Sequence, residues 1–208
     1  MKKICILDYG MGNIASLSNA IKKIGYTPEL YSEKEEINSN ILILPGVGAF
    51  NSAMEIIKKK NYAKLINSFV EKNDNFLFGI CLGMQILFNS SNENKVTKGL
   101  GLINGDVSKL QSINKIKLPH VGLNEIMIKN NEKFKFIKNY DNKKFYFVHS
   151  YAVKTLNEEN ILATSAYKNI DFTSIVTNNK NIIGTQFHPE KSSKIGLNFL
   201  EDVLKNFN

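Results

Sequence analysis

Short apolar runs alternate with helical segments over the first half of the chain, and this alternation limits the possible folds more than any other feature. The apolar runs are Lys3–Leu7, Ile41–Leu44 and Asn75–Ile80. Strands buried on both faces of a parallel sheet read as continuous apolar runs of this kind. Apolar residues recur at helical spacing in Ile14–Ile24, Ser52–Lys60, Tyr62–Lys72 and Met84–Phe88. The alternation predicts an α/β fold with a parallel sheet covered by helices on both faces.

Strand-like runs dominate the second half of the chain, with few helical segments between them. They are Phe145–Val153, Ala163–Tyr167, Ile175–Thr177 and Ile182–Phe187. Consecutive strands without intervening helices favour antiparallel pairing, so we expect an antiparallel or mixed extension of the sheet.

A terminal helix and a surface loop are also expected in this half. Ser192–Lys205 predicts the helix, with Ser192 or Ser193 as N-cap. Its apolar side would carry Leu197, Leu200 and Leu204. The polar stretch Asn89–Lys98 predicts the surface loop.

The length of 208 residues fits one α/β domain, residues 1–208, better than two small ones. Cys5 and Cys81 are its two cysteines, and so few thiols favour a reducing compartment. Asp8 interrupts the first apolar run, which is too short for a signal-peptide core of about 7–15 residues. Every apolar stretch is much shorter than a membrane-spanning helix, which needs about 20 residues. We therefore expect a cytoplasmic protein with no membrane partner.

The chain is basic, with a net charge of +8 and a pI near 9.3. A basic balance is typical of nucleic-acid binding when the cations form a stripe. Here the lysines are scattered, as in Lys58–Lys60, and the sequence shows no RNA-binding signature. We expect solvated faces or an acidic protein partner, and no nucleic-acid partner.

The strongest local motif is Gly79-Ile80-Cys81-Leu82-Gly83, between an apolar strand and a helical segment. It is the thiol counterpart of the nucleophile elbow, in which a tight turn exposes the central residue at the sheet edge. Glycines two positions on either side remove side chains that would collide in such a turn. A helix N-terminus next to the sulfur favours the thiolate. The alternative is a buried cysteine in the core, which is our interpretation of Cys5.

A cysteine nucleophile needs a base, and the chain has three histidines. His188 lies in Gln186-Phe187-His188-Pro189-Glu190, where residues two apart share one face of an extended segment. Glu190 on that face can orient the imidazole, as the carboxylate of a catalytic triad does. His120 and His149 are more typical of structural or partner-facing positions. The second ligand cluster of a zinc site is missing, so we expect no metal and no cofactor.

Acyl transfer also needs hydrogen-bond donors for the developing oxyanion. The turn Pro45-Gly46-Val47-Gly48 follows an apolar strand and offers backbone N–H groups. The N–H of Leu82, directly after the cysteine, is the other natural donor. Such a turn can also simply end a strand.

Motifs spread over nearly the whole chain carry a family resemblance. They are Asp8–Asn13, Leu44–Phe50, Gly79–Gln85, Thr97–Leu102, Tyr146–Tyr151 and Gln186–Ser193. This set resembles the class I glutamine amidotransferases, and within them the glutaminase subunits of imidazole glycerol phosphate synthases. The resemblance implies a flavodoxin-like, three-layer α/β sandwich with a mostly parallel central sheet and an antiparallel extension.

The resemblance also implies roles for individual residues. The implied catalytic residues are Cys81, His188 and Glu190. The implied oxyanion donors are backbone groups of Gly46, Val47 and Leu82. The implied contacts to the amino-acid end of L-glutamine are Gln85 and the backbone around Ser150 and Tyr151.

By the same resemblance, the ammonia released from glutamine passes to a (β/α)8-barrel cyclase subunit in a heterodimer. The implied interface residues are Asn13, His120, Tyr146 and Lys191, although Lys191 also fits an ordinary solvated lysine. The family pattern Pro-His-Met-Gly-Trp-Asn reads Pro119-His120-Val121-Gly122-Leu123-Asn124 here. Leu123 replaces a Trp on the side that faces the cyclase in relatives, which leaves the identity of the partner open.

Three alternatives stay open beside the histidine-pathway glutaminase. One is the same chemistry serving a sugar-modifying partner, and another is a catalytically silent partner-binding module. The third is a stand-alone thiol hydrolase, which Asp8–Asn13 fits poorly. We also expect weak glutaminase activity in isolation, because the glycine-containing Pro45–Gly48 turn can rotate its oxyanion donor away until a partner docks.

Overall fold

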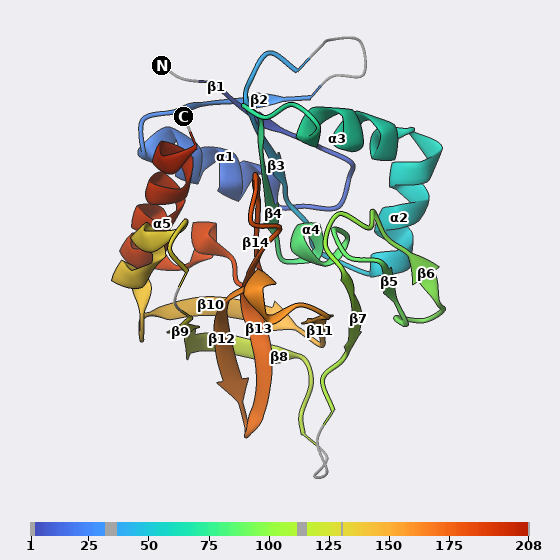
Figure 1. Ribbon diagram of the computed structural model, residues 1–208, viewed down its shortest axis with the longest axis vertical. Helices are drawn as coiled ribbons and strands as arrows, with labels where there is room; N and C mark the ends of the chain where they lie inside the picture. Colours follow the sequence, from blue (N-terminus) through green and yellow to red (C-terminus); the bar gives the residue numbers. More distant parts are fainter. Residues whose placement is uncertain (1–2, 32–36, 112–115, 130, 208) are drawn as a thin grey trace.

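The central sheet of the computed structural model begins parallel and ends antiparallel (Figure 1). The structure describes residues 3–31, 37–111, 116–129 and 131–207. Within them, the strand order of this sheet is β2-β1-β3-β4-β14-β13-β12-β9. The parallel strands are β2 (Thr27–Leu30), β1 (Lys3–Ile6), β3 (Ile41–Leu44), β4 (Phe76–Ile80) and β14 (Ile182–Thr185). The antiparallel strands are β13 (Ile170–Thr177), β12 (Ile161–Tyr167) and β9 (Met127–Ile128). The predicted parallel sheet with an antiparallel extension is confirmed.

Helices cover both faces of the parallel strands and complete the three layers (Figure 1). One face carries α1 (Ile14–Lys23) and α5 (Ser193–Asn206), and the other carries α2 (Phe50–Lys59) and α3 (Tyr62–Val70). The α1 helix begins at Asn13, whose side chain accepts a hydrogen bond of 3.1 Å from the Ser16 amide. The part of the chain that the structure describes contains no helix long and apolar enough to span a membrane.

Alternate residues of the buried strands supply two separate cores. In β3, Ile41 and Ile43 pack on the side of α1 and α5, whereas Leu42 and Leu44 pack on the side of α2 and α3. All four are fully buried, which explains why this strand reads as a continuous apolar run. The two cores hold the sheet from both sides and leave its carboxyl edge for the connecting turns.

Smaller sheets flank this edge. The β10 strand (Lys144–His149) pairs antiparallel with β8 (His120–Glu125). A second small sheet has the order β11-β7-β5-β6, formed by β11 (Tyr151–Thr155), β7 (Gly105–Lys109), β5 (Ser90–Ser91) and β6 (Thr97–Lys98). Short 3₁₀ helices are η1 (Lys135–Tyr140), η2 (Glu158–Asn160) and η3 (Pro189–Lys191), and α4 (Leu82–Gln85) is a single α-helical turn.

Four local predictions need correction. The run Phe145–Val153 is two strands in different sheets, because the chain changes partner at Ser150, between β10 and β11. The stretch Asn89–Lys98 is not all loop, since it contributes β5 and β6. The helix expected at Met84–Phe88 is α4, which ends at Gln85. Ser192 precedes α5 as predicted, but its hydroxyl makes no capping hydrogen bond to that helix.

Candidate active site

Cys81 and His188 lie close together because their strands are neighbours in the parallel sheet. Strands β4 and β14 pair in the register that places Ile80 beside Thr185. The amide N–H of Cys81 continues this pairing with a hydrogen bond of 2.7 Å to the Thr185 carbonyl. The segment from Gln186 to Glu190 therefore begins level with Cys81, at the edge where ligands meet parallel sheets.

The backbone of Cys81 has the conformation of a nucleophile elbow. Its φ of 54° and ψ of −109° lie in a region that L-residues rarely adopt. A Cβ atom on Gly83 would overlap the carbonyl oxygen of Leu44, and one on Gly79 would lie 2.8 Å from the Gly83 carbonyl oxygen. Both positions therefore require glycine for steric reasons, and the strained turn persists because the packed surroundings fix it.

The backbone around His188 is tied to the β10 strand as well as to β14. The His188 N–H donates to the Tyr146 carbonyl at 2.9 Å. The Ser192 hydroxyl donates to the His188 carbonyl at 2.6 Å and accepts from the Tyr146 N–H at 2.9 Å. The serine expected as a helix cap instead joins the histidine segment to a neighbouring strand.

Glu190 orients the imidazole of His188. The Nδ1 atom of His188 lies 2.8 Å from Oε1 of Glu190, and the two side chains are only 2% and 5% exposed. A carboxylate accepts, so Nδ1 carries a proton and Nε2 is directed to the cysteine side. Among the described residues, Nε2 of His188 and Oε2 of Glu190 have no hydrogen-bond partner within ordinary limits.

The charge of Cys81 acts on His188. Burial by itself lowers the pKa of His188, but the negative Cys81 thiolate, together with interactions with Cys81 and Glu190, outweighs burial and raises that pKa to about 10. The sulfur is thus close enough to stabilise an imidazolium. The arrangement supports a thiolate–imidazolium pair.

The turn expected to hold the oxyanion packs directly on the cysteine turn. A Cβ atom on Gly46 would lie 2.6 Å from Cβ of Leu82, so glycine allows this close approach. The Tyr9 hydroxyl fixes the turn by donating to the Pro45 carbonyl at 2.6 Å. The Val47 N–H, however, donates to the Met11 carbonyl at 3.0 Å. In this conformation the Val47 donor is engaged with Met11.

The residues expected to hold the substrate lie next to the sulfur site. The side-chain nitrogen of Gln85 donates to the Tyr151 carbonyl and to Oε1 of Gln186, both at 3.0 Å. The Ser150 carbonyl accepts a hydrogen bond of 2.9 Å from the Leu110 amide. Gln85 is buried, and Ser150 and Tyr151 are partly exposed. The Val148 carbonyl, two residues before Ser150, lies 4.0 Å from the Cys81 sulfur, so the β10–β11 connection passes beside the site.

Gln186 is a residue of the site for which the sequence predicts no role. In the structure its side chain is fully buried and its nitrogen lies 3.5 Å from the sulfur of Cys81. The position of its side chain could have been predicted from the sequence. Residues two apart share a face of an extended segment, so Gln186 lies on the same face as His188 and Glu190.

The residues expected at a partner interface separate into exposed and buried positions. Asn13 and Lys191 are exposed, and the ammonium group of Lys191 lies 6.0 Å from the centre of the partly exposed Tyr146 ring. His120 is only 3% exposed. Its β8 neighbours Val121 and Leu123 are 55% and 64% exposed. The outward apolar surface of β8 is therefore carried by Val121 and Leu123, whereas the His120 side chain lies beneath it.

His120 and His149 form a buried pair inside the aromatic core. Nδ1 of His149 lies 2.9 Å from the Tyr151 carbonyl, which only accepts, so this nitrogen carries the proton. Nε2 of His149 then accepts from Nδ1 of His120 at 3.1 Å. Burial, with the nearby His120 and His188, lowers the pKa of His149 to about 4, against the opposing effect of the Tyr151 hydrogen bond. Burial also lowers the pKa of His120.

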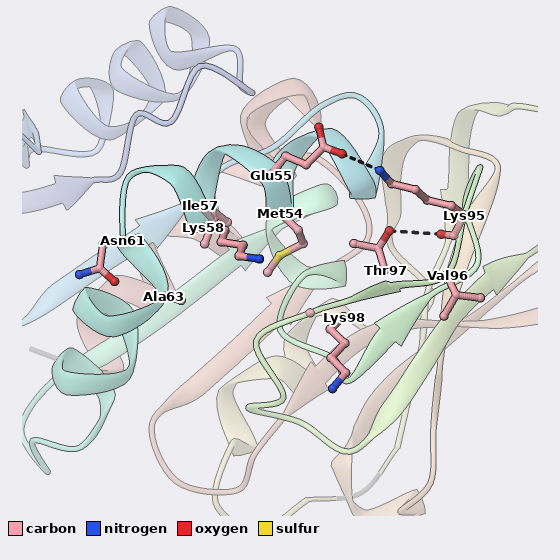
Figure 2. Close-up of a pocket in the computed structure, with 11 residues that line it drawn as sticks. Met54, Glu55, Ile57, Lys58, Asn61, Ala63, Lys95, Val96, Thr97 and Lys98 are labelled. Atoms are coloured by element: carbon pink, nitrogen blue, oxygen red, sulfur yellow. Dashed lines mark hydrogen bonds and ion pairs between the residues drawn. The ribbon is translucent and has the colours of Figure 1, made fainter.

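A cavity of about 590 Å³ lies away from these residues, between α2, α3 and β6 (Figure 2). Figure 2 shows Lys95 reaching across its rim to Glu55, with 2.7 Å between the charged atoms. Its lining does not include Cys81, His188 or Glu190. Within the described ranges, no group of three His, Cys, Asp or Glu side chains is arranged to hold a metal ion.

Comparisons with known proteins identify the family of this chain. Residues 5–207 match the glutamine amidotransferase class-I family. A similar relative is imidazole glycerol phosphate synthase subunit HisH 2 of Methanococcus maripaludis, 45% identical over 97% of this chain and 98% of its own length. The subunit HisH of Methanosarcina barkeri is 44% identical over 100% of this chain and 98% of its own length.

Solved structures show the same fold at low sequence identity. The structure of PurLQS from Thermotoga maritima superposes with a TM-score of 0.75 and 16% identity, covering 100% of this chain and 99% of that one. A crystal structure of a glutamine amidotransferase gives a TM-score of 0.73. The chain therefore belongs to the class I glutamine amidotransferases, among the glutaminase subunits of imidazole glycerol phosphate synthase.

Proposed function

We propose that this chain hydrolyses L-glutamine to glutamate and ammonia with Cys81, His188 and Glu190 as its catalytic residues. The observation that carries the proposal is the strained Cys81 turn on β4 beside the buried His188–Glu190 pair on the segment after β14. A thiolate, a base and an orienting carboxylate are the groups that acyl transfer from an amide requires.

In the first half-reaction, the Cys81 sulfur forms a bond to the side-chain carbonyl carbon of glutamine. The oxygen gains negative charge, and the backbone N–H of Leu82 would donate to it. Val47 would be the second donor once its N–H leaves the Met11 carbonyl. The C–N bond then breaks, His188 gives its proton to the leaving nitrogen, and ammonia departs from a thioester.

In the second half-reaction, neutral His188 removes a proton from water. The hydroxide attacks the thioester carbon, the C–S bond breaks and glutamate leaves with the Cys81 thiolate restored. Glu190 stays ionised and keeps Nε2 of His188 directed to the sulfur through both steps. The side-chain oxygen of Gln85 is available to the ammonium group of the substrate, since the Gln85 nitrogen donates to Tyr151 and Gln186.

We further propose that the ammonia passes within a cytoplasmic heterodimer to a (β/α)8-barrel cyclase subunit, which makes imidazole glycerol phosphate and aminoimidazole carboxamide ribotide for histidine biosynthesis. The relatives named above are subunits of that synthase. The docking surface would comprise Asn13, Val121, Leu123, Tyr146 and Lys191. Leu123 and Tyr146 are directly paired between β8 and β10, so they belong to one continuous surface.

A coupled assay tests the function. The chain is combined with the histidine-pathway cyclase subunit, and glutamate and imidazole glycerol phosphate are measured with glutamine as nitrogen donor. Both products should form with the wild type. Cys81→Ala should abolish both, whereas added ammonium salt should restore imidazole glycerol phosphate. Glutamine-supported synthesis by Cys81→Ala would instead indicate a catalytically silent module.

The sugar-pathway alternative rests on Leu123, which replaces the family Trp on the docking surface. The same assay with a cyclase-like subunit of an amino-sugar pathway separates the two. Stimulated glutamine hydrolysis with that subunit, and none with the histidine-pathway cyclase, would reassign the partner while leaving the glutaminase chemistry in place.

A further inference from the structure

The amide side chain of Gln186 contacts the sulfur of Cys81. Nε2 of Gln186 lies 3.5 Å from Sγ, a normal distance for an N–H···S hydrogen bond. Gln186 is fully buried, and its backbone N–H is held by the Ser174 carbonyl at 2.9 Å. Burial and the fixed backbone limit the positions that this amide can take.

The orientation of the Gln186 amide follows from its neighbours. The Tyr151 carbonyl can only accept, so the Gln85 atom next to it is the NH₂ group. The same NH₂ group lies 3.0 Å from the Gln186 amide, which must present its oxygen there. The Gln186 nitrogen is therefore left facing the sulfur, and a rotated amide would set two donors or two acceptors against each other.

A donor in this position distinguishes the two protonation states of the cysteine. As a thiol, Cys81 can donate to the Val148 carbonyl, 4.0 Å away. As a thiolate it can only accept, and the Gln186 N–H and the His188 imidazolium are the donors facing it. Tyr9 is another titratable group near the sulfur, and burial, then the Cys81 charge, keeps it neutral by raising its pKa. Hydrogen bonds to the charged form favour that form.

We propose that Gln186 is a positioning residue that holds the Cys81 sulfur as a thiolate beside His188, and that Gln85 locks the Gln186 amide in the required orientation. In this proposal Gln85 has two roles. It binds the substrate, and it orients the Gln186 amide that contacts the Cys81 sulfur. Because this role presupposes that Cys81 is the nucleophile of the proposed function, its test includes a measurement that needs no turnover.

Alkylation of Cys81 by iodoacetamide as a function of pH is that measurement, because only the thiolate reacts. Peptide mass spectrometry separates Cys81 from Cys5, whose pKa is raised to about 12 by burial. Gln186→Met keeps the length of the side chain and removes the donor. Gln186→Glu keeps the shape and replaces the donor with an acceptor. Ser174→Ala is the matched control, since it alters the buried side chain of the residue whose carbonyl holds the Gln186 N–H.

The alkylation profile of Gln186→Met should move to higher pH, with about a tenfold lower reaction rate at pH 7, because a hydrogen bond to a charged acceptor is lost. Gln186→Glu should move further in the same direction. In the coupled assay kcat should fall by about tenfold or more, with KM changed less than about threefold. Ser174→Ala should match the wild type in both measurements.

Wild-type alkylation profiles in both Gln186 variants would overturn the proposal. If Gln186→Met does not fold, an unchanged profile in Gln186→Glu overturns it alone. A shifted profile in a chain that hydrolyses no glutamine with any partner would refute the proposed function and leave the positioning role standing. Normal glutamine hydrolysis together with unshifted alkylation profiles would support the proposed function and refute the positioning role.

Discussion

The Val47 N–H donates a 3.0 Å hydrogen bond to the carbonyl oxygen of Met11. The same N–H is the expected donor to the oxyanion, so the group cannot serve both acceptors at once. Gly48, the next residue, has a φ of 109°, a conformation that glycine adopts readily. The structure therefore holds the turn in a state that must change before a full oxyanion hole exists.

We predict that docking of the cyclase partner releases Val47 from Met11 and raises glutamine hydrolysis by about tenfold or more over the isolated chain, since one missing oxyanion donor costs roughly 100-fold or more in kcat. Hydrogen exchange of the Val47 amide, followed by NMR, should be slow in the isolated chain and faster in the complex. Equal turnover and equal exchange in the two states would refute partner gating.

Replacing Glu190 by Gln should lower kcat by roughly 100- to 10,000-fold with little change in KM, because the amide no longer fixes the tautomer and charge of His188. Glu201→Gln is a suitable control: it removes a carboxylate of α5 that forms an ion pair with Lys205, 2.6 Å away. Steady-state glutaminase kinetics with the partner present measure both. A Glu190→Gln enzyme within threefold of wild type would remove the carboxylate from the mechanism.

Gly83→Ala should destabilise the fold by about 3 kcal/mol or more, because the added methyl overlaps the Leu44 carbonyl at the end of the buried strand β3. For a chain of this size the melting temperature should fall by at least about 6 °C. Gly12→Ala, whose methyl would lie 3.2 Å from the Pro45 side chain, should lower it much less. Equal melting temperatures would show that the elbow can relax around a side chain.

The buried His149 predicts a loss of stability in mild acid. Its pKa is lowered to about 4 in the folded chain, whereas an unfolded histidine titrates near 6.5. The unfolded state therefore binds the proton first as pH falls, so the contribution of His149 to stability is complete above about 6.5 and declines below it. Each pH unit in that window costs about 1.4 kcal/mol. The raised pKa of His188 acts in a higher pH range, where stability declines as pH rises toward about 10.

Urea unfolding at pH 7 and pH 5 should show a decrease of about 2 kcal/mol for the wild type from His149, with His120 adding in the same direction. His149→Gln keeps a donor for Tyr151 and removes the titration, so its decrease should be clearly smaller. The same decrease in the variant would assign the acid sensitivity to other groups.

The sequence was sufficient for the features that depend on short-range pattern. The apolar runs of β1, β3 and β4 are visible because both faces of each strand are buried. The glycines around Cys81 are visible because the elbow tolerates no side chain at Gly83. The spacing of His188 and Glu190 is visible because extended segments repeat every two residues.

Features that depend on tertiary partners were not visible. The β2 strand contains Pro28 and lies at the edge of the sheet, where a missing N–H is tolerated, so its short polar sequence gave no strand pattern. The change of sheet at Ser150 leaves the apolar alternation of β10 and β11 uninterrupted in the sequence. The burial of His120 depends on stacking with Tyr167, whose rings are 4.2 Å apart, a contact between segments distant in sequence.

The pairing of β4 with β14 has a consequence for how this enzyme tolerates change. The distance between nucleophile and base is set by one interstrand spacing of about 4.8 Å and not by the length of chain that links them. Insertions or deletions in the loops between β5 and β13 therefore leave that spacing unchanged. A slip of a single residue between the two strands, in contrast, would turn the imidazole to the other face of its segment and end catalysis.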